Sequence, residues 1–258
     1  FMAVVVFLVI FGSLVAPQDP DAQDLTATLA GPSSEHWLGT DSLGRDVFSR
    51  ILVGTQSAIL GPLIIAVVSM LIGNVLGLLA GYNGGIVDSL LMRWVDLMVA
   101  IPSLLIIIVV AGALGGGYWL AVGVLTVLTV PFDARVMRAV VLEQVPRPYV
   151  EAAKALGVSN RRIMLQHIWP NISSVAVANA VLVFATSLIA LSGLSFLGLG
   201  AAPGTPDWGQ MLAESRVLLF SNPIAAIAPG IAIILTATSV NLIGDWVFEK
   251  MSSRGVHR

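Results

Sequence analysis

Titratable residues concentrate in two segments of this sequence. One runs from Glu151 to Asn171 (EAAKALGVSNRRIMLQHIWPN), and the other, HWLGTDSLGRDVFSRILVG, places His36 near Asp41 and Asp46. A histidine with two carboxylates suggests a metal site, but one histidine without a second ligand pair is weak support for it. Lone surface acids are the commoner interpretation, so we expect no metal on this chain.

The motifs of bond-making enzymes are missing from the sequence. It contains no G-x-x-x-x-G-K-[ST] phosphate loop, no H-E-x-x-H and no G-x-S-x-G, and its three histidines are scattered. The absence of cysteine excludes thiolate sites and disulfides. A net charge of −2 argues against a nucleic-acid partner. We therefore expect neither catalysis nor a cofactor, and interpret His167 as structural.

The composition indicates what must surround these charged segments. Of 258 residues, 57% are hydrophobic and 11% are charged, and the mean hydropathy is +0.92. A soluble domain usually carries about 25% charged residues. Too few charges remain to cover a water-facing surface, so the sequence predicts an all-α membrane protein whose solvent is mostly lipid.

Long uncharged runs predict six membrane-spanning helices, because one crossing needs about 20 apolar residues. The predicted spans are 1–18, 56–82, 96–114, 118–138, 172–197 and 223–248. A cleaved signal peptide is the alternative for the first, but no small-x-small cleavage site follows it. Because the chain opens with Phe1 rather than methionine, we expect that preceding residues are missing. Neither a repeat nor a linker divides the chain, which predicts one membrane domain over 1–258.

The distribution of Lys and Arg predicts the orientation of the chain. Threading six spans places ten basic residues on one side and three on the other, and the richer side is expected to be cytoplasmic. The ten are Arg93, Arg135, Arg138, Arg147, Lys154, Arg161, Arg162, Lys250, Arg254 and Arg258, and the three are Arg45, Arg50 and Arg216. Both termini, the loop 81–96 and the segment 139–171 are then cytoplasmic, whereas 17–55 and 198–222 form an acidic external face.

The segment that begins at Glu151 has the pattern of a helix–turn–helix. Ala152, Ala153 and Ala155 suit close packing, and Gly157 ends the first helix because glycine adopts the left-handed conformation. Ser159 or Asn160 can cap the next helix, whose expected apolar side is Ile163, Leu165 and Ile168, before Pro170 marks the entry to the fifth span. The pattern predicts a small rigid knob for docking, and an ordinary basic loop is the alternative.

Further motifs predict packing and interfacial roles. Gly73, Gly77 and Gly81 are four residues apart, a spacing that lets a neighbouring helix approach closely. In the predicted loop 81–96, an ion pair between Arg93 and Asp96 is expected, with a solvated role. Asp41 is expected to cap a short amphipathic helix at the membrane surface that carries Val47, Phe48, Ile51 and Leu52. Trp208 suits an interfacial aromatic belt.

At the level of whole motifs, the sequence resembles a known family. Glu151-Ala152-Ala153, Gly157 and Pro170 resemble the EAA loop of ATP-binding-cassette importer permeases, although His167 and Trp169 replace the usual Ile and Leu. The blocks HWLGTDSLGRDVFSRILVG, GYNGGIVDSLLMRWVDLMVAIP, LSFLGLG, TPDWGQML and NLIGDW look like the C-type permease subunit of dipeptide, oligopeptide and nickel systems. These blocks reach from His36 to Trp246.

The resemblance implies a type I importer permease fold in a bacterial or archaeal plasma membrane. It implies a heterodimer with a B-type permease, two ATPase subunits that bind ATP and Mg, and an extracytoplasmic solute-binding protein. The residues implied to couple to the ATPases are Glu151, Ala152, Ala153, Lys154, Gly157, Val158, Ser159, Arg161, Arg162 and Pro170. Topology suggests Asp41, Arg45, Asp46, Asp207, Trp208 and Glu214 as contacts for the binding protein.

The resemblance leaves the solute open between peptides, nickel and other small molecules. Relatives usually carry a glutamate where this chain has Leu191, which puts in doubt any cation-contact role of that position. The alternative class is a self-contained secondary transporter, which needs intramembrane acids, and Asp88 and Asp96 are the candidates that we identify for it.

Overall fold

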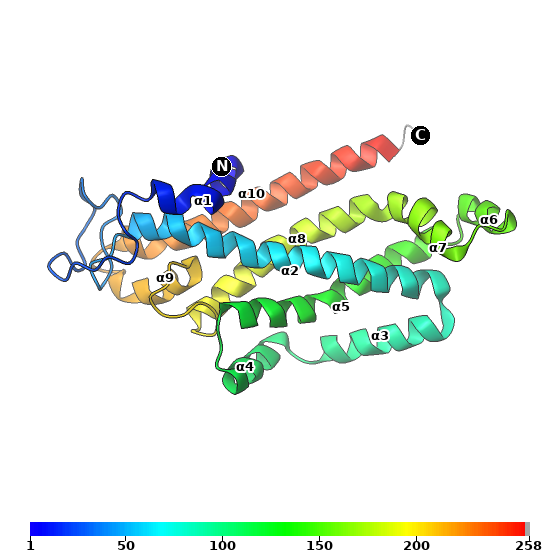
Figure 1. Ribbon diagram of the computed structural model, residues 1–258, viewed down its shortest axis with the longest axis horizontal. Coiled ribbons are helices and arrows are strands. Elements are labelled where there is room, and N and C mark those ends of the chain that lie inside the picture. The colour runs from blue at the N-terminus through cyan, green and yellow to red at the C-terminus, as the bar shows by residue number, and fades with distance from the viewer. Residues whose placement is uncertain (256–258) are drawn as a thin grey trace. The chain divides into compact units, whose positions relative to one another are not determined.

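The computed structural model describes residues 1–255, which are helical apart from turns, loops and one isolated bridge between Thr40 and Asp46 (Figure 1). Arg258, counted above for orientation, lies outside the described residues. The helices are α1 (Met2–Val15), α2 (Val47–Asn83), α3 (Gly85–Ala100), α4 (Ser103–Leu114), α5 (Tyr118–Gln144), α6 (Pro148–Ala155), α7 (Asn160–Arg162), a π-helical stretch Ile163–Ile168, α8 (Trp169–Phe196), α9 (Trp208–Glu214), a 3₁₀ turn Ser215–Leu218 and α10 (Pro223–Gly255).

Four helical stretches are long and apolar enough to cross a membrane. They are Val47–Asn83, Tyr118–Gln144, Asn160–Phe196 and Pro223–Lys250. α3 and α4 meet the same criteria only as a pair, bent by 78°. α1 has 14 residues, fewer than the roughly 20 of a full crossing. Each of the six predicted spans thus coincides with helix, but the third is broken and the first is short.

The expected loop 81–96 is wrong, because α3 begins at Gly85. The expected pair within it is also wrong: Asp96 accepts a hydrogen bond from Arg135 of α5 at 2.5 Å rather than pairing with Arg93. The acids of α3 thus face arginines of another helix. Sequence spacing within α3 favoured the local partner, and only the packing of α3 beside α5 brings the distant one into reach.

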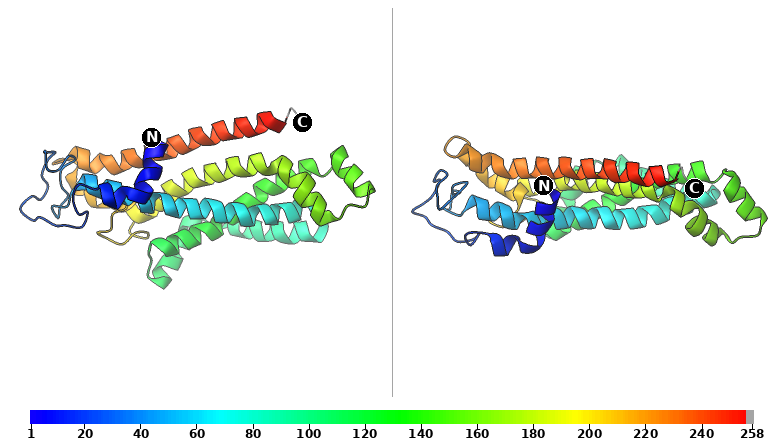
Figure 2. Two further views of the ribbon diagram at one scale, coloured as in Figure 1. Left: turned by 45° about the horizontal axis from the view of Figure 1, so that its top comes forward. Right: turned by 90° about the horizontal axis from the view of Figure 1, so that it is seen from above.

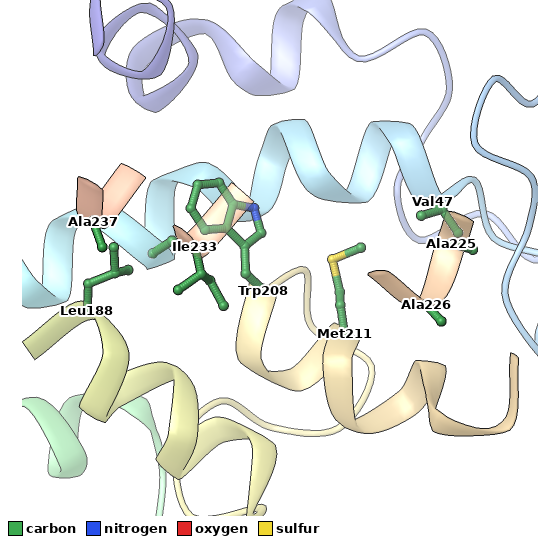
Figure 3. Close-up of a cluster of buried hydrophobic side chains, with 9 residues drawn as sticks. Val47, Leu188, Trp208, Met211, Ala225, Ala226, Ile233 and Ala237 are labelled. Carbon is green, nitrogen blue, oxygen red and sulfur yellow. The ribbon is translucent and has the colours of Figure 1, made fainter. Parts of the chain in front are cut away.

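The chain forms two compact units, and α2, α5, α8 and α10 each contribute one end to each unit. One unit comprises residues 1–64, 108–123 and 184–240. Its core packs Trp208 and Met211 of α9 against side chains of α2, α8 and α10, including Val47, Leu188 and Ile233 (Figure 3). The ring nitrogen of Trp208 donates to the carbonyl of Ile51 at 3.0 Å.

α2 begins after Asp46, whose carboxylate accepts a hydrogen bond from the backbone N–H of Ser49 at 2.7 Å. This geometry is that of a helix N-cap. The predicted cap at Asp41 is therefore wrong, and Phe48 and Ile51 lie in the opening turns of the 37-residue α2 rather than on a separate surface helix. One long helix replaces the expected pair because no stop signal follows Ile51.

The second unit comprises residues 65–107, 124–183 and the chain from residue 241. Its core contains buried apolar side chains of α5, α6, the π-helical stretch and α8. Figures 1 and 2 show α6 and α7 as a hairpin at the joined ends of α5 and α8. Residues 148–162, which include both short helices, are called the knob below.

Candidate functional site

The knob is shaped by a glycine that closes α6. Gly157 has φ +73°, a left-handed conformation that side chains rarely adopt. The N–H of Gly157 donates to the carbonyl of Lys154 at 3.0 Å, and the N–H of Val158 donates to the carbonyl of Ala153 at 3.1 Å. This pair of bonds is a Schellman motif, which satisfies the last carbonyls of the helix. The turn has the structure that the sequence predicts.

One face of the knob is anchored in the second unit. Val150 is fully buried and Ala153 is 5% exposed, in a cluster with Met137 and Val141 of α5 and with Ile163, which directly follows the knob. Burying side chains of this size contributes about 1.5–3 kcal/mol each. Motion of the knob therefore requires motion of the end of α5.

The other face of the knob is open. Leu156 is 83% exposed, and Glu151, Ala152 and Lys154 are also exposed. The prediction that Leu165 packs on the apolar side of the second helix, with Ile163 and Ile168, is wrong, because Leu165 is 51% exposed. A small tip with one large apolar side chain and charged flanks suits docking to another protein better than it suits burial in lipid.

The second half of the knob is fixed by polar contacts. Ser159 occupies the N-cap position of α7 but its side chain makes no capping hydrogen bond. Asn160 instead accepts a hydrogen bond from the hydroxyl of Tyr82 at 3.0 Å, and the ammonium of Lys154 lies 5.3 Å from the centre of the Tyr82 ring. Tyr82, at the end of α2, therefore contacts both arms of the turn.

Pro170 lies in the first turn of α8, directly after the π-helical stretch. Proline lacks an N–H, so it cannot donate to the carbonyl one turn earlier. The side chain of Asn171 donates to the carbonyl of His167 at 2.6 Å. The wider π turn and this side-chain bond accommodate the proline while the helix continues.

The three glycines of α2 meet the backbone of α5. A Cβ on Gly77 would lie 2.7 Å from the carbonyl oxygen of Ala134, and one on Gly81 would lie 3.0 Å from the carbonyl oxygen of Arg138. A Cβ on Gly73 would collide with the side chain of Asp133. Small residues let two membrane helices approach to backbone contact. This close approach joins α2 to the segment that leads into the knob.

The residues suggested for binding-protein contact are not at the surface. Asp41, Arg45, Asp46, Asp207 and Trp208 are each at most 5% exposed, and the side chain of Glu214 is 20% exposed. Their expected exposure is wrong, and Trp208 does not belong to an interfacial belt. Hydropathy alone predicts that charged side chains lie at the surface. Here they are buried because they form ion pairs with one another.

The buried charges form an arginine network: Arg45, Arg50, Asp41 and Glu214. Arg45 bonds to Asp41 at 2.7 Å and to Glu214 at 2.8 Å. The guanidinium groups of Arg45 and Arg50 both donate to the carbonyl of Gly204 at 3.1 Å. Two cations and two anions balance, which offsets much of the cost of removing them from water. The network joins the loop after α1 to the loop after α8.

The ring of His36 contacts one of the two acids near it in the sequence. Its Nδ1 lies 3.0 Å from Asp46, while Asp41 is committed to Arg45. No group of three metal-ligating side chains occurs in the described part of the chain.

One buried acid escaped the sequence analysis. Asp133 lies inside α5, is 2% exposed, and accepts a hydrogen bond from Asn179 of α8 at 2.7 Å. Its second carboxylate oxygen has no hydrogen-bond partner in the structure. The sequence signal for Asp133 is an acid within the predicted span 118–138, whereas the two candidates identified from the sequence, Asp88 and Asp96, lie in the predicted loop 81–96.

Comparison with known proteins identifies the class of protein that carries this site. Residues 73–254, which include the glycine contacts and the knob, match the family described as the binding-protein-dependent transport system inner membrane component. The chain belongs to this family. It is a multi-pass membrane permease subunit of an ATP-binding-cassette importer, a transport component rather than an enzyme.

The relatives cover nearly the whole chain. It is 37% identical over 253 residues to the probable D,D-dipeptide transport system permease protein of Escherichia coli K12, covering 98% of this chain and 85% of that protein. It is 38% identical to a glutathione transport system permease protein of Pectobacterium atrosepticum, with the same coverage. A dipeptide transport system permease protein of Alkalihalophilus pseudofirmus is 36% identical, covering 96% and 82% of the two chains.

The fold is also that of a solved importer permease. A chain of the MetNI methionine ABC transporter, in an inward facing conformation, matches with a TM-score of 0.64 over 79% of this chain and 97% of that chain. A second crystal form gives a TM-score of 0.62. Identities of 19% and 17% support the likeness of fold alone.

Proposed function

We propose that this permease imports short peptides. The observation that carries the proposal is the near full-length similarity to three permeases named for D,D-dipeptide, glutathione and dipeptide transport, all of which are small peptides. The chain forms half of the translocation pathway with a B-type permease. Two ATPase subunits supply ATP hydrolysis, ATP and Mg bind to them, and a solute-binding protein delivers the peptide.

The proposed docking element for the ATPases is the knob. Its anchored face ties it to α5, and its exposed tip at Leu156 offers an apolar contact flanked by Glu151 and Lys154. The buried side chain of Ala153 and the partly buried side chain of Val158 maintain its shape rather than touch the partner. Closure of the ATPases would push the tip, and the buried anchor would carry that motion into the helices.

This role fixes the proposed orientation. With the knob in the cytoplasm, the positive-inside count places both termini there as well. On the same count, the segments 17–55 and 198–222, which hold the arginine network, are external. Since its charges are buried, the proposed contact with the binding protein uses exposed neighbours in the same segment, such as Trp37, which is 60% exposed and packs on Phe48.

Co-purification and uptake test the assignment of partners and substrate. A tagged chain expressed with its neighbouring subunits is expected to bring down a second permease and an ATPase pair. Proteoliposomes that hold this complex and the binding protein are expected to transport a labelled dipeptide only when ATP is present on the side of the membrane that carries the ATPases. Uptake that is independent of ATP would instead support a secondary transporter.

The knob is tested by Gly157→Pro. Proline requires φ near −65° and has no N–H, so it can neither adopt the left-handed turn nor donate to Lys154. We expect ATP hydrolysis to become uncoupled from uptake, and Glu151→Lys to have the same effect. Ala155→Ser is the matched control, because Ala155 is exposed on α6 and is not among the residues implied to couple. Wild-type coupling in both test variants would refute the docking role.

A further inference from the structure

α3 is flanked by left-handed glycines at its start and by a bend in the chain at its end. It begins at Gly85, and Gly84 and Gly85 have φ of +63° and +55° with open space around them. It ends at Ile101 and Pro102, where the chain bends by 78° into α4. Val95 is its only buried residue. A helix with so little buried surface depends on its polar contacts for its position.

Two ion pairs attach α3 to α5. Asp88 accepts from both the Nε and the Nη2 atoms of Arg138, the second at 2.5 Å, and Asp96 accepts from Arg135 at 2.5 Å. The first pair is bidentate, which fixes direction as well as distance. Its side chains are 19% and 29% exposed, whereas those of Asp96 and Arg135 are 70% and 46% exposed. The pair of Asp88 with Arg138 is therefore the stronger constraint.

Arg138 lies in the part of α5 that packs both against α2 and against the cluster that anchors the knob. Cβ atoms added to Gly77 and Gly81 of α2 would lie 2.8 Å from its backbone nitrogen and 3.0 Å from its carbonyl oxygen. The flanking residues Met137 and Val141 are in the buried cluster that anchors the knob. A displacement of the knob must therefore reach the turn of α5 that carries the guanidinium of Arg138.

We propose that Asp88 and Arg138 are positioning residues for transport, acting as a clasp that makes α3 move with the knob. The proposal rests on the proposed docking of the knob to the ATPases. α3 can move with the knob because its ends lie at left-handed glycines and at a bend. It must do so because the bidentate pair opposes sliding of α3 along α5. Without the clasp, closure of the ATPases would still move the knob and α5, but α3 would not move with them.

The test compares uptake with ATP hydrolysis in proteoliposomes that hold the complete transporter. For Asp88→Asn we expect assembly and ATP hydrolysis close to wild type, and peptide uptake per ATP reduced about five- to tenfold, the lower end of an ordinary coupling free energy. Asp88→Arg combined with Arg138→Asp restores an opposite-charge pair and is expected to recover much of the loss. Asp96→Asn, which removes an exposed pair, is the matched control with a coupling ratio near wild type.

Distances provide a readout that stability does not. Because the chain has no cysteine, spin labels can be placed at Leu90→Cys on α3 and Ala155→Cys on the knob, both of which are exposed. With the clasp intact, we expect one narrow distance distribution in each nucleotide state. Asp88→Asn is expected to broaden it in the ATP state.

The outcomes separate the clasp from the knob. If Gly157→Pro uncouples transport and Asp88→Asn does not, the clasp proposal is refuted while the docking role stands. If Asp88→Asn lowers the melting temperature but leaves both the coupling ratio and the distances unchanged, the pair is only structural and the proposal is again refuted. If neither variant uncouples, the docking role fails and the clasp fails with it.

Discussion

Replacing Gly77 by alanine tests the contact between α2 and α5 with a single methyl group. The new Cβ would lie 2.7 Å from the carbonyl oxygen of Ala134 and 2.8 Å from the backbone nitrogen of Arg138. Ordinary contact begins at 3.4 Å, so each approach is about 0.6–0.7 Å too short. Both atoms belong to the α5 backbone, which cannot rotate away as a side chain would. The helices must separate instead.

Overpacking of this kind typically costs about 1–3 kcal/mol. The assay is thermal unfolding of the purified complex in detergent, followed by the loss of the monodisperse peak in size-exclusion chromatography. We expect Gly77→Ala to lower the melting temperature by several degrees.

Gly123→Ala provides the matched control. Gly123 lies in α5, and a Cβ there would meet no atom within 4 Å. Alanine is favoured over glycine in a helix by about 1 kcal/mol, so this variant is expected to be as stable as the wild type or slightly more stable. A melting temperature for Gly77→Ala equal to that of the wild type would refute the backbone contact on which the packing argument depends.

Substitutions at three buried polar groups are tested by the same melting assay. Tyr118→Phe removes a hydroxyl that bridges a backbone N–H and a carbonyl of α2, and is expected to cost about 1–3 kcal/mol; an unchanged melting temperature would contradict this. Glu214→Ala leaves two buried guanidinium groups with Asp41 as the remaining acid of the arginine network and should cost about 3 kcal/mol, whereas Glu35→Ala at an exposed position should cost nothing measurable. Asp133→Asn keeps an acceptor for Asn179 and should preserve stability, while Asp133→Ala should lower it by about 1–3 kcal/mol; equal effects of the two would refute the bond.

The local features of the chain were predictable because their causes are local. A run of about 20 apolar residues must become a helix in lipid, wherever the rest of the chain lies. The turn at Gly157 likewise follows from one residue that tolerates φ +73°. The four-residue spacing of the α2 glycines indicated a packing face, although not which helix would meet it.

The sequence by itself determined the solvent, the positions of the long apolar spans and the turn of the knob. Only the tertiary structure decided which polar residues are buried and with which partners. Arg45 and Glu214 are 169 positions apart, and Asp88 and Arg138 are 50 apart, so no periodicity relates them. A hydropathy pattern predicts that charged residues lie at the surface, because burying an unpaired charge costs free energy. The partner that offsets this cost is supplied by the packing of distant helices and loops.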